Sequence, residues 1–412
     1  MNRIYLDHNA TSPLLPEVAR GMTELLENGT AGNPSSLHQD GRGARRVLED
    51  ARDRVAAALS VEPAEIFFTS GGTESNNLAI CGLVTDHPAV SASATEHPSI
   101  LEPVKQLHSS GRPGSIIPVS ASGRVDLDQV PEEGLVSVHW FNNETGISQD
   151  LDSIAEKVHQ KGGRFHTDGA QGFFRTPVSL GDSAVDAATI TAHKAGGPSG
   201  VGALWIRKGF LQRPFIHGGP QEKKIRPGTE NLLAIHGMGI LAETCFKEPS
   251  WDRSHLERLR SLFLETLRAA CSHKAVEQNQ DDWPGCLNLS FEGVHAETLL
   301  VRLDLIALRG VVHTAPAHEQ RIARRAQLLR QPPLRLNATR VQRQQLRAEL
   351  HRRLAPGVVR WGAALARSAE TDGGVLATFS GGVECRCATL VGADGVRSAV
   401  RALRDAAPGM PP

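Results

Sequence analysis

The chain has 412 residues, of which 40% are hydrophobic, and its 45 basic side chains balance 45 acidic ones. This length permits two domains and a sizeable core. The longest apolar stretches, such as Leu78 to Val84, are much shorter than the roughly 20 residues of a membrane span, and no signal-like apolar block begins the chain. We therefore expect a cytoplasmic protein with no membrane contact.

The spacing of apolar residues predicts the following elements in chain order: helices at 16–26 and 41–59, strands at 65–69 and 135–140, a helix at 151–160, strands at 164–168, 187–191 and 202–206, helices at 231–246 and 254–270, and a strand at 287–291. Strands that alternate with helices favour an α/β fold with a mainly parallel, doubly wound sheet. A domain boundary is predicted near Pro249, after which the last helix and strand begin a smaller unit.

Ligands bind such sheets at the carboxyl ends of the strands, so the residues that follow each strand are the candidate site residues. Strand 65–69 is followed by Ser70-Gly71-Gly72-Thr73 and an apolar helix. Paired glycines let the backbone approach an anion, Thr73 supplies a hydroxyl, and the start of the helix supplies free N–H groups. The segment predicts a phosphate cradle that includes Gly72 and Thr73. The alternative is an ordinary Gly-Gly turn with a threonine cap.

Strand 187–191 leads into Thr191-Ala192-His193-Lys194. A lysine at the end of a strand, beside a hydroxyl and an imidazole, can be partly desolvated, which lowers its pKa and frees the amine to form an imine. Lys194 is therefore the candidate for covalent attachment of a carbonyl group. The alternative is a solvated surface charge, as most lysines are.

Asp168 and Gln171 lie at and just after the end of strand 164–168. Asp168 could hold a pyridinium nitrogen protonated, and Gln171 could bond to the phenolic oxygen of the same ring. Alternatively, Asp168 caps the next helix. Two further segments, Asn142–Gly146 and Thr95–His97, add a polar contact and an imidazole that could stack on a ring, although a lone histidine is more often structural.

The six cysteines are scattered without the spacing of metal ligands: Cys81, Cys245, Cys271, Cys286, Cys385 and Cys387. Cys385 and Cys387 lie only two positions apart and make a poor half of a zinc site. We therefore expect no metal site and interpret the cysteines as reduced, mostly structural thiols.

Taken together and in this order, these motifs resemble those of the cysteine desulfurases in the class V aminotransferase family. The resemblance covers roughly residues 3 to 306. It is carried by Tyr5–Pro13, Gly32–Ser36, Phe68–Asn77, Glu96–His97, Asn142–Gly146, Asp168 with Gln171, His193–Lys194, Arg226–Thr229 and Leu287–Phe291. So many motifs in register argue against a chance match.

The resemblance implies a pyridoxal-phosphate-dependent transferase of fold type I, in which a mainly parallel sheet is sandwiched by helices. Lys194 would hold pyridoxal 5'-phosphate covalently, His97 would stack on its ring, and Asp168 would face the ring nitrogen. The remaining implied contacts are Asn143 and Gln171 to the ring oxygen, and Gly72, Thr73, Thr191 and His193 to the phosphate.

Members of this family are homodimers in which a threonine of an Arg-Ser-Gly-Thr segment reaches the phosphate of the partner subunit. Thr229, at the end of segment 226–229, is the matching residue, so the resemblance implies a homodimer with shared sites. It also implies L-cysteine as substrate, alanine as product and a sulfur-acceptor scaffold protein of iron–sulfur cluster assembly as partner. Residues 1–15 would be the arm of a small domain, 16–249 the cofactor-binding large domain, and 250–306 the start of the small domain.

The resemblance fails after residue 306. The family carries its nucleophilic cysteine on a loop of the small domain, but the matching region Leu305–Pro316 contains no cysteine, and the arginine that clamps the substrate carboxylate is also unmatched. These losses predict weak or absent persulfide-forming activity. Two alternatives stay open. One is a pyridoxal-phosphate-dependent lyase that eliminates a β-substituent with Lys194 as the base, and the other is a catalytically silent dimer that binds the cofactor.

Residues 307–412 form an atypical segment with 17 Arg, no Lys and 7 acidic residues. Segments 346–350, 357–362 and especially 391–401 resemble part of a flavin-dependent aromatic hydroxylase, but the chain lacks the Gly-x-Gly-x-x-Gly turn that binds the flavin pyrophosphate. We expect no flavin and interpret the tail as a fused or frame-disrupted fragment, with a makeshift small domain as the alternative. The arginines are not interleaved with aromatic residues for base stacking, so no nucleic-acid partner is expected.

Overall fold

The computed structural model describes residues 4–28, 32–84, 88–214, 216–247, 252–270, 275–277, 282–291, 308–310, 365–371, 374–379 and 384–387. The chain divides into two compact units, residues 1–335 and 336–412. The boundary predicted near Pro249 lies outside the described residues. The same is true of most of Leu305–Pro316 and of the three flavoprotein-like segments, 346–350, 357–362 and 391–401.

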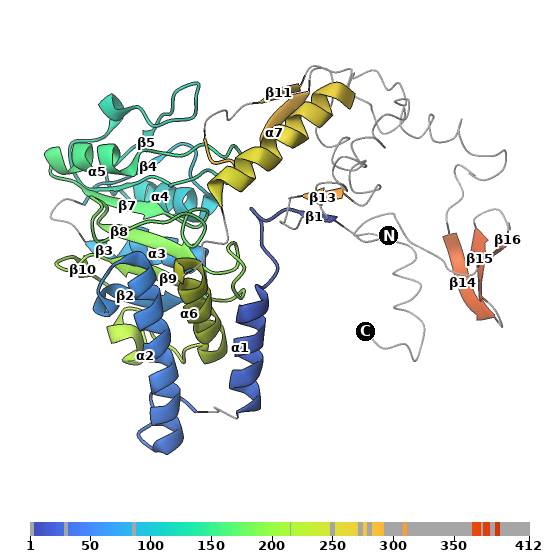
Figure 1. The fold of residues 1–412 in the computed structure, drawn as a ribbon, viewed down its shortest axis with the longest axis horizontal. Helices are drawn as coiled ribbons and strands as arrows, with labels where there is room; N and C mark the ends of the chain where they lie inside the picture. The colour runs from blue at the N-terminus through green and yellow to red at the C-terminus, as the bar shows by residue number, and fades with distance from the viewer. Residues whose placement is uncertain are drawn as a thin grey trace. The chain divides into compact units, whose positions relative to one another are not determined.

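The first unit contains a seven-stranded sheet with the strand order β2-β9-β8-β7-β6-β4-β5 (Figure 1). Its strands are β2 Ile66–Thr69, β4 Val90–Ser93, β5 Ile116–Ile117, β6 Leu135–Ser137, β7 Arg164–Asp168, β8 Ala187–Thr191 and β9 Gly202–Ile206. Strands β5, β4, β6, β7 and β8 run parallel, whereas β9 is antiparallel to both of its neighbours. The predicted mainly parallel α/β sheet is confirmed.

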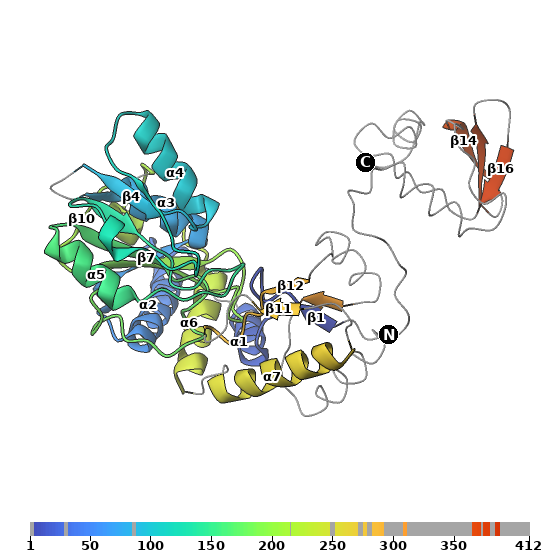
Figure 2. The same cartoon turned by 90° about the horizontal axis from the view of Figure 1, so that it is seen from above.

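Helices cover both faces of this sheet. The described α-helices are α1 Pro16–Glu27, α2 Gln39–Leu59, α3 Gly72–Gly82, α4 Pro98–Ser109, α5 Leu151–Gln160, α6 Leu232–Lys247 and α7 Arg253–Ala270. Successive side chains of a strand point to opposite faces. Phe67 belongs to an apolar cluster with Leu78 of α3 and Ile100 of α4. Phe68 belongs instead to a cluster with Leu48 of α2, which packs beside α6 (Figure 2).

Local sequence explains where the helices begin and end. Pro16 starts α1, where its missing N–H has no intrahelical acceptor to lose. His38 caps α2 by accepting a hydrogen bond from the Gly41 N–H at 3.3 Å, and Ser60 ends this helix with a left-handed φ of 57°. Asp150 caps α5 with its carboxylate. The five helices predicted from the spacing of apolar residues are confirmed, with small differences at their ends, and α3 is the apolar helix expected beside Thr73.

Helix α4 is not predicted from the sequence because it contains a proline. Pro103 lacks the N–H that would bond to the Ser99 carbonyl one turn earlier, and such a residue usually marks the end of a helix. In the structure, Nδ2 of Asn77 on α3 donates to that carbonyl at 3.4 Å. A neighbouring helix therefore supplies a donor at the position that the proline leaves open.

The strand predicted at 135–140 ends at Ser137 in the structure, but the Trp140 N–H still donates to the Asp168 carbonyl of β7 at 3.0 Å. The strand predicted at 287–291 is found as β12 Leu289–Phe291.

Smaller sheets pair β1 Ile4–Leu6 with β13 Leu308–Gly310, β3 Leu83–Val84 with β10 Leu211–Gln212, and β11 Ala275–Glu277 with β12. In the second unit, β14 Leu365–Thr371, β15 Gly374–Phe379 and β16 Glu384–Cys387 form an antiparallel sheet. No helix in the described parts of the chain is long and apolar enough to cross a membrane.

Candidate active site

The segment predicted to hold a phosphate lies where α3 begins. Gly71 caps this helix with a φ of 151°, a conformation that essentially only glycine adopts. A Cβ atom added to Gly72 would lie 3.8 Å from the Thr189 side chain and 3.9 Å from that of Thr191. The amino terminus of α3, with its free N–H groups and positive dipole, therefore lies against the carboxyl end of β8.

Three further polar side chains belong to this region. Thr73 is exposed on the first turn of α3. Nδ1 of His193 lies 3.1 Å from Oγ1 of Thr11. Thr191 is only 2% exposed, and its Oγ1 has no hydrogen-bond partner within the described structure. A buried hydroxyl without a partner costs free energy unless a ligand supplies one, so hydroxyls, an imidazole and backbone N–H groups are available here to an anion.

Lys194 follows the end of β8 and is held through its backbone. Its carbonyl accepts hydrogen bonds from Ser12 Oγ at 2.8 Å and from Arg175 Nε at 3.0 Å. Burial lowers the pKa of the Lys194 amine, Asp168 partly opposes this shift, and Arg175 adds to it. Burial and the neighbouring Lys194 also lower the pKa of His193. A lowered pKa increases the share of the neutral amine, which is the form that can attack a carbonyl or accept a proton.

Asp168 ends β7 and is 7% exposed. Its Oδ1 accepts a hydrogen bond from the Ala170 N–H at 3.0 Å, and its Oδ2 accepts one from Asn76 Nδ2 at 2.7 Å. The residues directly after Asp168 form turns and no helix, so the alternative interpretation of Asp168 as a helix cap is wrong. Both carboxylate oxygens of Asp168 therefore accept a hydrogen bond.

Gln171 and Asn143 are connected through Asn9 of the amino-terminal arm. Gln171 Nε2 donates to the Asn9 carbonyl at 2.9 Å, and Asn9 Nδ2 donates to the Asn143 carbonyl at 3.0 Å. Arg175 Nη1 donates to Gln171 Oε1 at 2.6 Å, and burial lowers the pKa of this guanidinium to about 10. Sequence reasoning did not single out Asn9 or Arg175, although Asn9 lies in the motif Tyr5–Pro13 and Arg175 follows Gln171 by four residues.

His97 lies at the start of α4 and is exposed. Its Nδ1 accepts a hydrogen bond from the Ser99 N–H at 3.1 Å and lies 2.7 Å from Ser99 Oγ. The imidazole is therefore fixed on one edge by the helix that it caps, and its other edge is available to a ligand.

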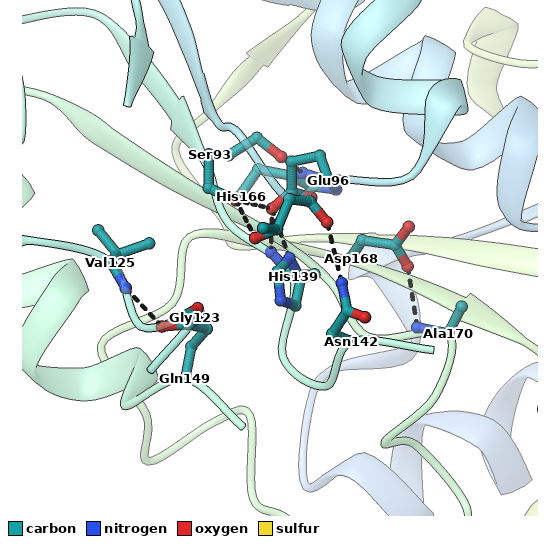
Figure 3. Close-up of polar contacts among 12 residues, drawn as sticks. Ser93, Glu96, Gly123, Val125, His139, Asn142, Gln149, His166, Asp168 and Ala170 are labelled. Carbon is teal, nitrogen blue, oxygen red and sulfur yellow. Dashed lines mark hydrogen bonds and ion pairs between the residues drawn. The ribbon is translucent and has the colours of Figure 1, made fainter. Parts of the chain in front are cut away.

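The residue before His97 belongs to a buried ion pair (Figure 3). Glu96 Oε1 lies 2.8 Å from His139 Nδ1 and also accepts a hydrogen bond from Ser93 Oγ at 2.6 Å. Burial alone would lower the pKa of His139, but the carboxylates of Glu96 and Asp168 raise it overall.

His166 lies on β7, two residues before Asp168, and behaves in the opposite way. Its Nδ1 is 2.9 Å from Ser137 Oγ and its Nε2 is 3.1 Å from Thr189 Oγ1. Burial lowers the pKa of His166 to about 4, although Asp168 opposes the shift. His166 is therefore a neutral side chain that joins three neighbouring strands at physiological pH.

Thr229 is the last of the predicted site residues. It is exposed in the loop before α6, and the preceding Gly228 has a left-handed φ of 104° that turns the chain. In the single chain Thr229 is thus an exposed residue on a turn of the chain.

The chain matches the family model described as "Aminotransferase class-V" over residues 4–337. It is 38% identical over 312 residues to a cysteine desulfurase IscS of Dictyoglomus turgidum, an alignment that covers 73% of this chain and 79% of the relative. It is 37% identical over 320 residues to a mitochondrial cysteine desulfurase of Drosophila melanogaster, covering 74% and 69%. This chain belongs to the class V aminotransferase family.

Solved structures agree with this assignment. A NifS-like protein superposes with a TM-score of 0.74 at 30% identity, covering 80% of this chain and 99% of that one. DndA from Streptomyces lividans superposes with a TM-score of 0.62 at 34% identity, covering 78% and 95%. The family match extends beyond residue 306, where the sequence motifs of the family end, to residue 337.

Class V aminotransferases of the cysteine desulfurase type use pyridoxal 5'-phosphate. The residues of this chain fit that cofactor. The unpartnered Thr191 hydroxyl and the glycine-capped start of α3 suit a phosphate, and the buried Asp168 carboxylate suits a protonated ring nitrogen. The Lys194 amine, with its lowered pKa, suits a carbonyl.

Proposed function

We propose that this class V aminotransferase is a pyridoxal-phosphate-dependent, cysteine desulfurase-like enzyme with Lys194 as its covalent lysine. One observation carries the proposal: the buried Asp168 and the Lys194 amine, whose pKa is lowered, lie within electrostatic reach of one another at the carboxyl ends of adjacent strands. When bound, the cofactor supplies an electron-accepting ring that stabilises negative charge at the substrate Cα.

The residues of the chain would then have separate tasks. Asp168 would keep the ring nitrogen protonated, because its carboxylate, oriented by hydrogen bonds from Asn76 and Ala170, would face that nitrogen. Lys194 would move the proton at the substrate Cα, since burial lowers the pKa of its amine and the neutral amine can accept a proton. His97 stacks on the ring, and Asn143 and Gln171 bind its oxygen.

The phosphate would be bound by two subunits. Gly72, Thr73, Thr191 and His193 contribute from one chain, while Thr229 of a second copy completes the site. The exposed position of Thr229 supports a homodimer, since an exposed residue is accessible to another chain.

We further propose L-cysteine as the substrate, alanine as the product, a sulfur-acceptor scaffold protein of iron–sulfur cluster assembly as the partner, and the cytoplasm as the location. Persulfide formation is expected to be weak because Leu305–Pro316 contains no cysteine. Cys286 does not offer a substitute, since burial raises the pKa of its thiol, although a hydrogen bond to Asn9 partly opposes the shift. A thiol of raised pKa is a poor nucleophile at neutral pH.

The second candidate is a lyase that eliminates the β-substituent of L-cysteine and, with the addition of water, releases sulfide, ammonia and pyruvate. The Lys194 amine and the missing loop cysteine favour it, because β-elimination needs a base but no protein thiol.

Product analysis separates the two candidates. The cofactor-loaded full-length protein is incubated with L-cysteine, and alanine, pyruvate, free sulfide and protein-bound persulfide are measured separately. Slow alanine formation supports the desulfurase-like proposal, whereas pyruvate with free sulfide favours the lyase. If no product forms and the cofactor spectrum does not change, both enzymatic proposals are refuted. The remaining interpretation is then a dimer that binds the cofactor without activity.

A further inference from the structure

We propose that Asn76 and Ser99 are positioning residues that connect Asp168 to His97 through a directed chain of hydrogen bonds. This inference deepens the proposed function and rests on it, because Asp168 and His97 are the two groups assigned there to the cofactor ring. Neither Asn76 nor Ser99 is among the residues assigned above to the cofactor or the substrate.

The chain of contacts is continuous and buried. Asn76 Nδ2 lies 2.7 Å from Asp168 Oδ2 and 2.8 Å from Ser99 Oγ. Ser99 Oγ lies 2.7 Å from His97 Nδ1. Asn76 is 1% exposed and Ser99 is 8% exposed, so water does not compete readily for these bonds. The three connecting bonds join α3, the first turn of α4 and the end of β7.

The carboxylate sets the orientation of the Asn76 amide. An ionised Asp168 only accepts hydrogen bonds, so the Asn76 amide must turn its nitrogen toward it. The same nitrogen then donates its second hydrogen to Ser99 Oγ. Oδ1 of Asn76 is left buried without a hydrogen-bond partner in the described structure. The flipped amide would place this oxygen against the Asp168 anion, so the unpaired oxygen is the less costly of the two arrangements.

The hydrogen bond to the His97 imidazole also has a defined donor. Ser99 Oγ accepts a hydrogen from Asn76 and therefore directs its own hydrogen to His97 Nδ1. The Ser99 N–H is also directed at this nitrogen, at 3.1 Å. With two donors facing it, Nδ1 of His97 carries no hydrogen, and the N–H of the neutral ring is placed on Nε2. The backbone N–H of Ser99 already favours this tautomer, and the charge of Asp168 reinforces it through two intervening side chains.

A role limited to packing would give a different response to mutation. If Asn76 only fills space, then Asn76→Ala affects stability but leaves the nitrogen environment of His97 unchanged, because the two side chains have no direct hydrogen bond among those described. If the chain of hydrogen bonds is directed, Asn76→Ala removes the donor that orients the Ser99 hydroxyl, and the hydrogen bond from this hydroxyl to His97 Nδ1 weakens. The nitrogen environment of His97 therefore tests the role of Asn76, with which His97 has no described hydrogen bond.

The test uses nitrogen NMR of the histidines in the full-length protein without cofactor, with His97 assigned by a His97→Gln variant. We expect wild type to show a bare Nδ1 and a protonated Nε2. Asn76→Ala and Ser99→Ala should each move the Nδ1 signal toward that of a nitrogen with one donor fewer. Ser99→Thr keeps the hydroxyl and should therefore keep the wild-type Nδ1 signal. Ser109→Ala is the matched control, since Ser109 is exposed on the same helix and its hydroxyl donates to the Gln106 carbonyl.

A second measurement uses the protein loaded with pyridoxal phosphate. Asn76→Ala removes a hydrogen bond to a buried charge, and we expect about a tenfold loss of cofactor affinity and a shift in the pH dependence of the visible band.

The proposal is overturned if the Nδ1 signal of His97 is unchanged in Asn76→Ala, or if it changes equally in Ser109→Ala. If Ser99→Ala does not fold, Ser99→Thr and Asn76→Ala still decide the question. Because the first measurement needs no cofactor, failure of the proposed function, seen as a protein that does not bind pyridoxal phosphate, is distinguishable from failure of this inference.

Discussion

Arg226 forms an ion pair with Glu74, with Arg226 Nε 2.8 Å from Glu74 Oε1. Glu74 directly follows Thr73 at the start of α3, and Arg226 lies three residues before Thr229. Glu74 Oε2 also accepts a hydrogen bond from the Ser70 N–H at 2.7 Å. The contact therefore joins the proposed phosphate cradle of one subunit to the loop that we propose serves the other.

Loss of this ion pair should weaken cofactor binding. Arg226→Ala leaves the Glu74 carboxylate uncompensated beside the site proposed for a phosphate, and we expect roughly a tenfold loss of affinity for pyridoxal phosphate. Titration of the protein without cofactor, followed by tryptophan fluorescence, measures this affinity. Arg20→Ala is the control, because Arg20 forms an exposed pair with Glu17. Equal affinities in the two variants would argue against the coupling.

The buried ion pair between Arg52 and Glu222 should dominate the stability of the loop that follows β10. Arg52 donates to both Glu222 oxygens, at 2.7 and 2.9 Å, and Glu222 also accepts from the Phe68 N–H. Arg52→Ala leaves a buried carboxylate without its cation, and we expect the free energy of unfolding to fall by about 3 to 5 kcal/mol. Arg54→Ala, which breaks an exposed pair on the same helix, should cost at most about 1 kcal/mol. Urea unfolding of both variants makes the comparison, and similar costs would contradict the account.

His166 should make the protein less stable in acid. The pKa of His166 falls from its ordinary 6.5 to about 4 on folding, so between these values the unfolded chain binds a proton that the folded chain does not. The stability contributed by the neutral ring is therefore present above pH 6.5. As the pH falls toward 4, the free energy of unfolding should decrease by roughly 3 kcal/mol. His166→Gln should reduce the slope of unfolding free energy against pH in this window, and the exposed His217→Gln should not. An unchanged slope in His166→Gln would show that the ring is not buried as described.

His139 should contribute with the opposite sign. Its pKa is raised on folding, mainly because Glu96 outweighs the effect of burial. The stability that it contributes is fully present below its ordinary pKa and is lost as the pH rises through the raised value. The destabilisation caused by His139→Gln should thus be larger near pH 5 than near pH 9, as measured by urea unfolding. A cost independent of pH would contradict an ion pair with Glu96.

Much of the fold could be predicted because periodicity and turn residues are local signals. Strands β7, β8 and β9 have the predicted ends, since their β-branched and apolar runs stop at polar or glycine residues. Helix α4 could not be predicted, because Pro103 argues against a helix unless a neighbour such as Asn77 supplies the missing donor. That donor comes from another element, so no local pattern reveals it.

The candidate site divides in the same way. Lys194 and Asp168 follow strand ends and can be found from the sequence, because the carboxyl ends of parallel strands meet at one edge of the sheet. The bond between Asn76 and Asp168 joins residues 92 positions apart, and the pair of Glu96 with His139 joins residues 43 positions apart. Such contacts depend on how α3 and α4 pack on the sheet, and packing is not encoded in any short motif.

The central claim, that Lys194 binds pyridoxal phosphate covalently, is tested most directly by the visible absorption of the purified full-length protein, followed by borohydride reduction and mass spectrometry of its peptides. We predict that the protein is yellow, that borohydride reduction removes this colour, and that the reduced cofactor is then attached to Lys194 and to no other lysine. The covalent label should be lost in Lys194→Ala but kept in the exposed control Lys208→Ala. A wild-type protein that stays colourless with added pyridoxal phosphate, or a label on a lysine other than Lys194, would contradict the account.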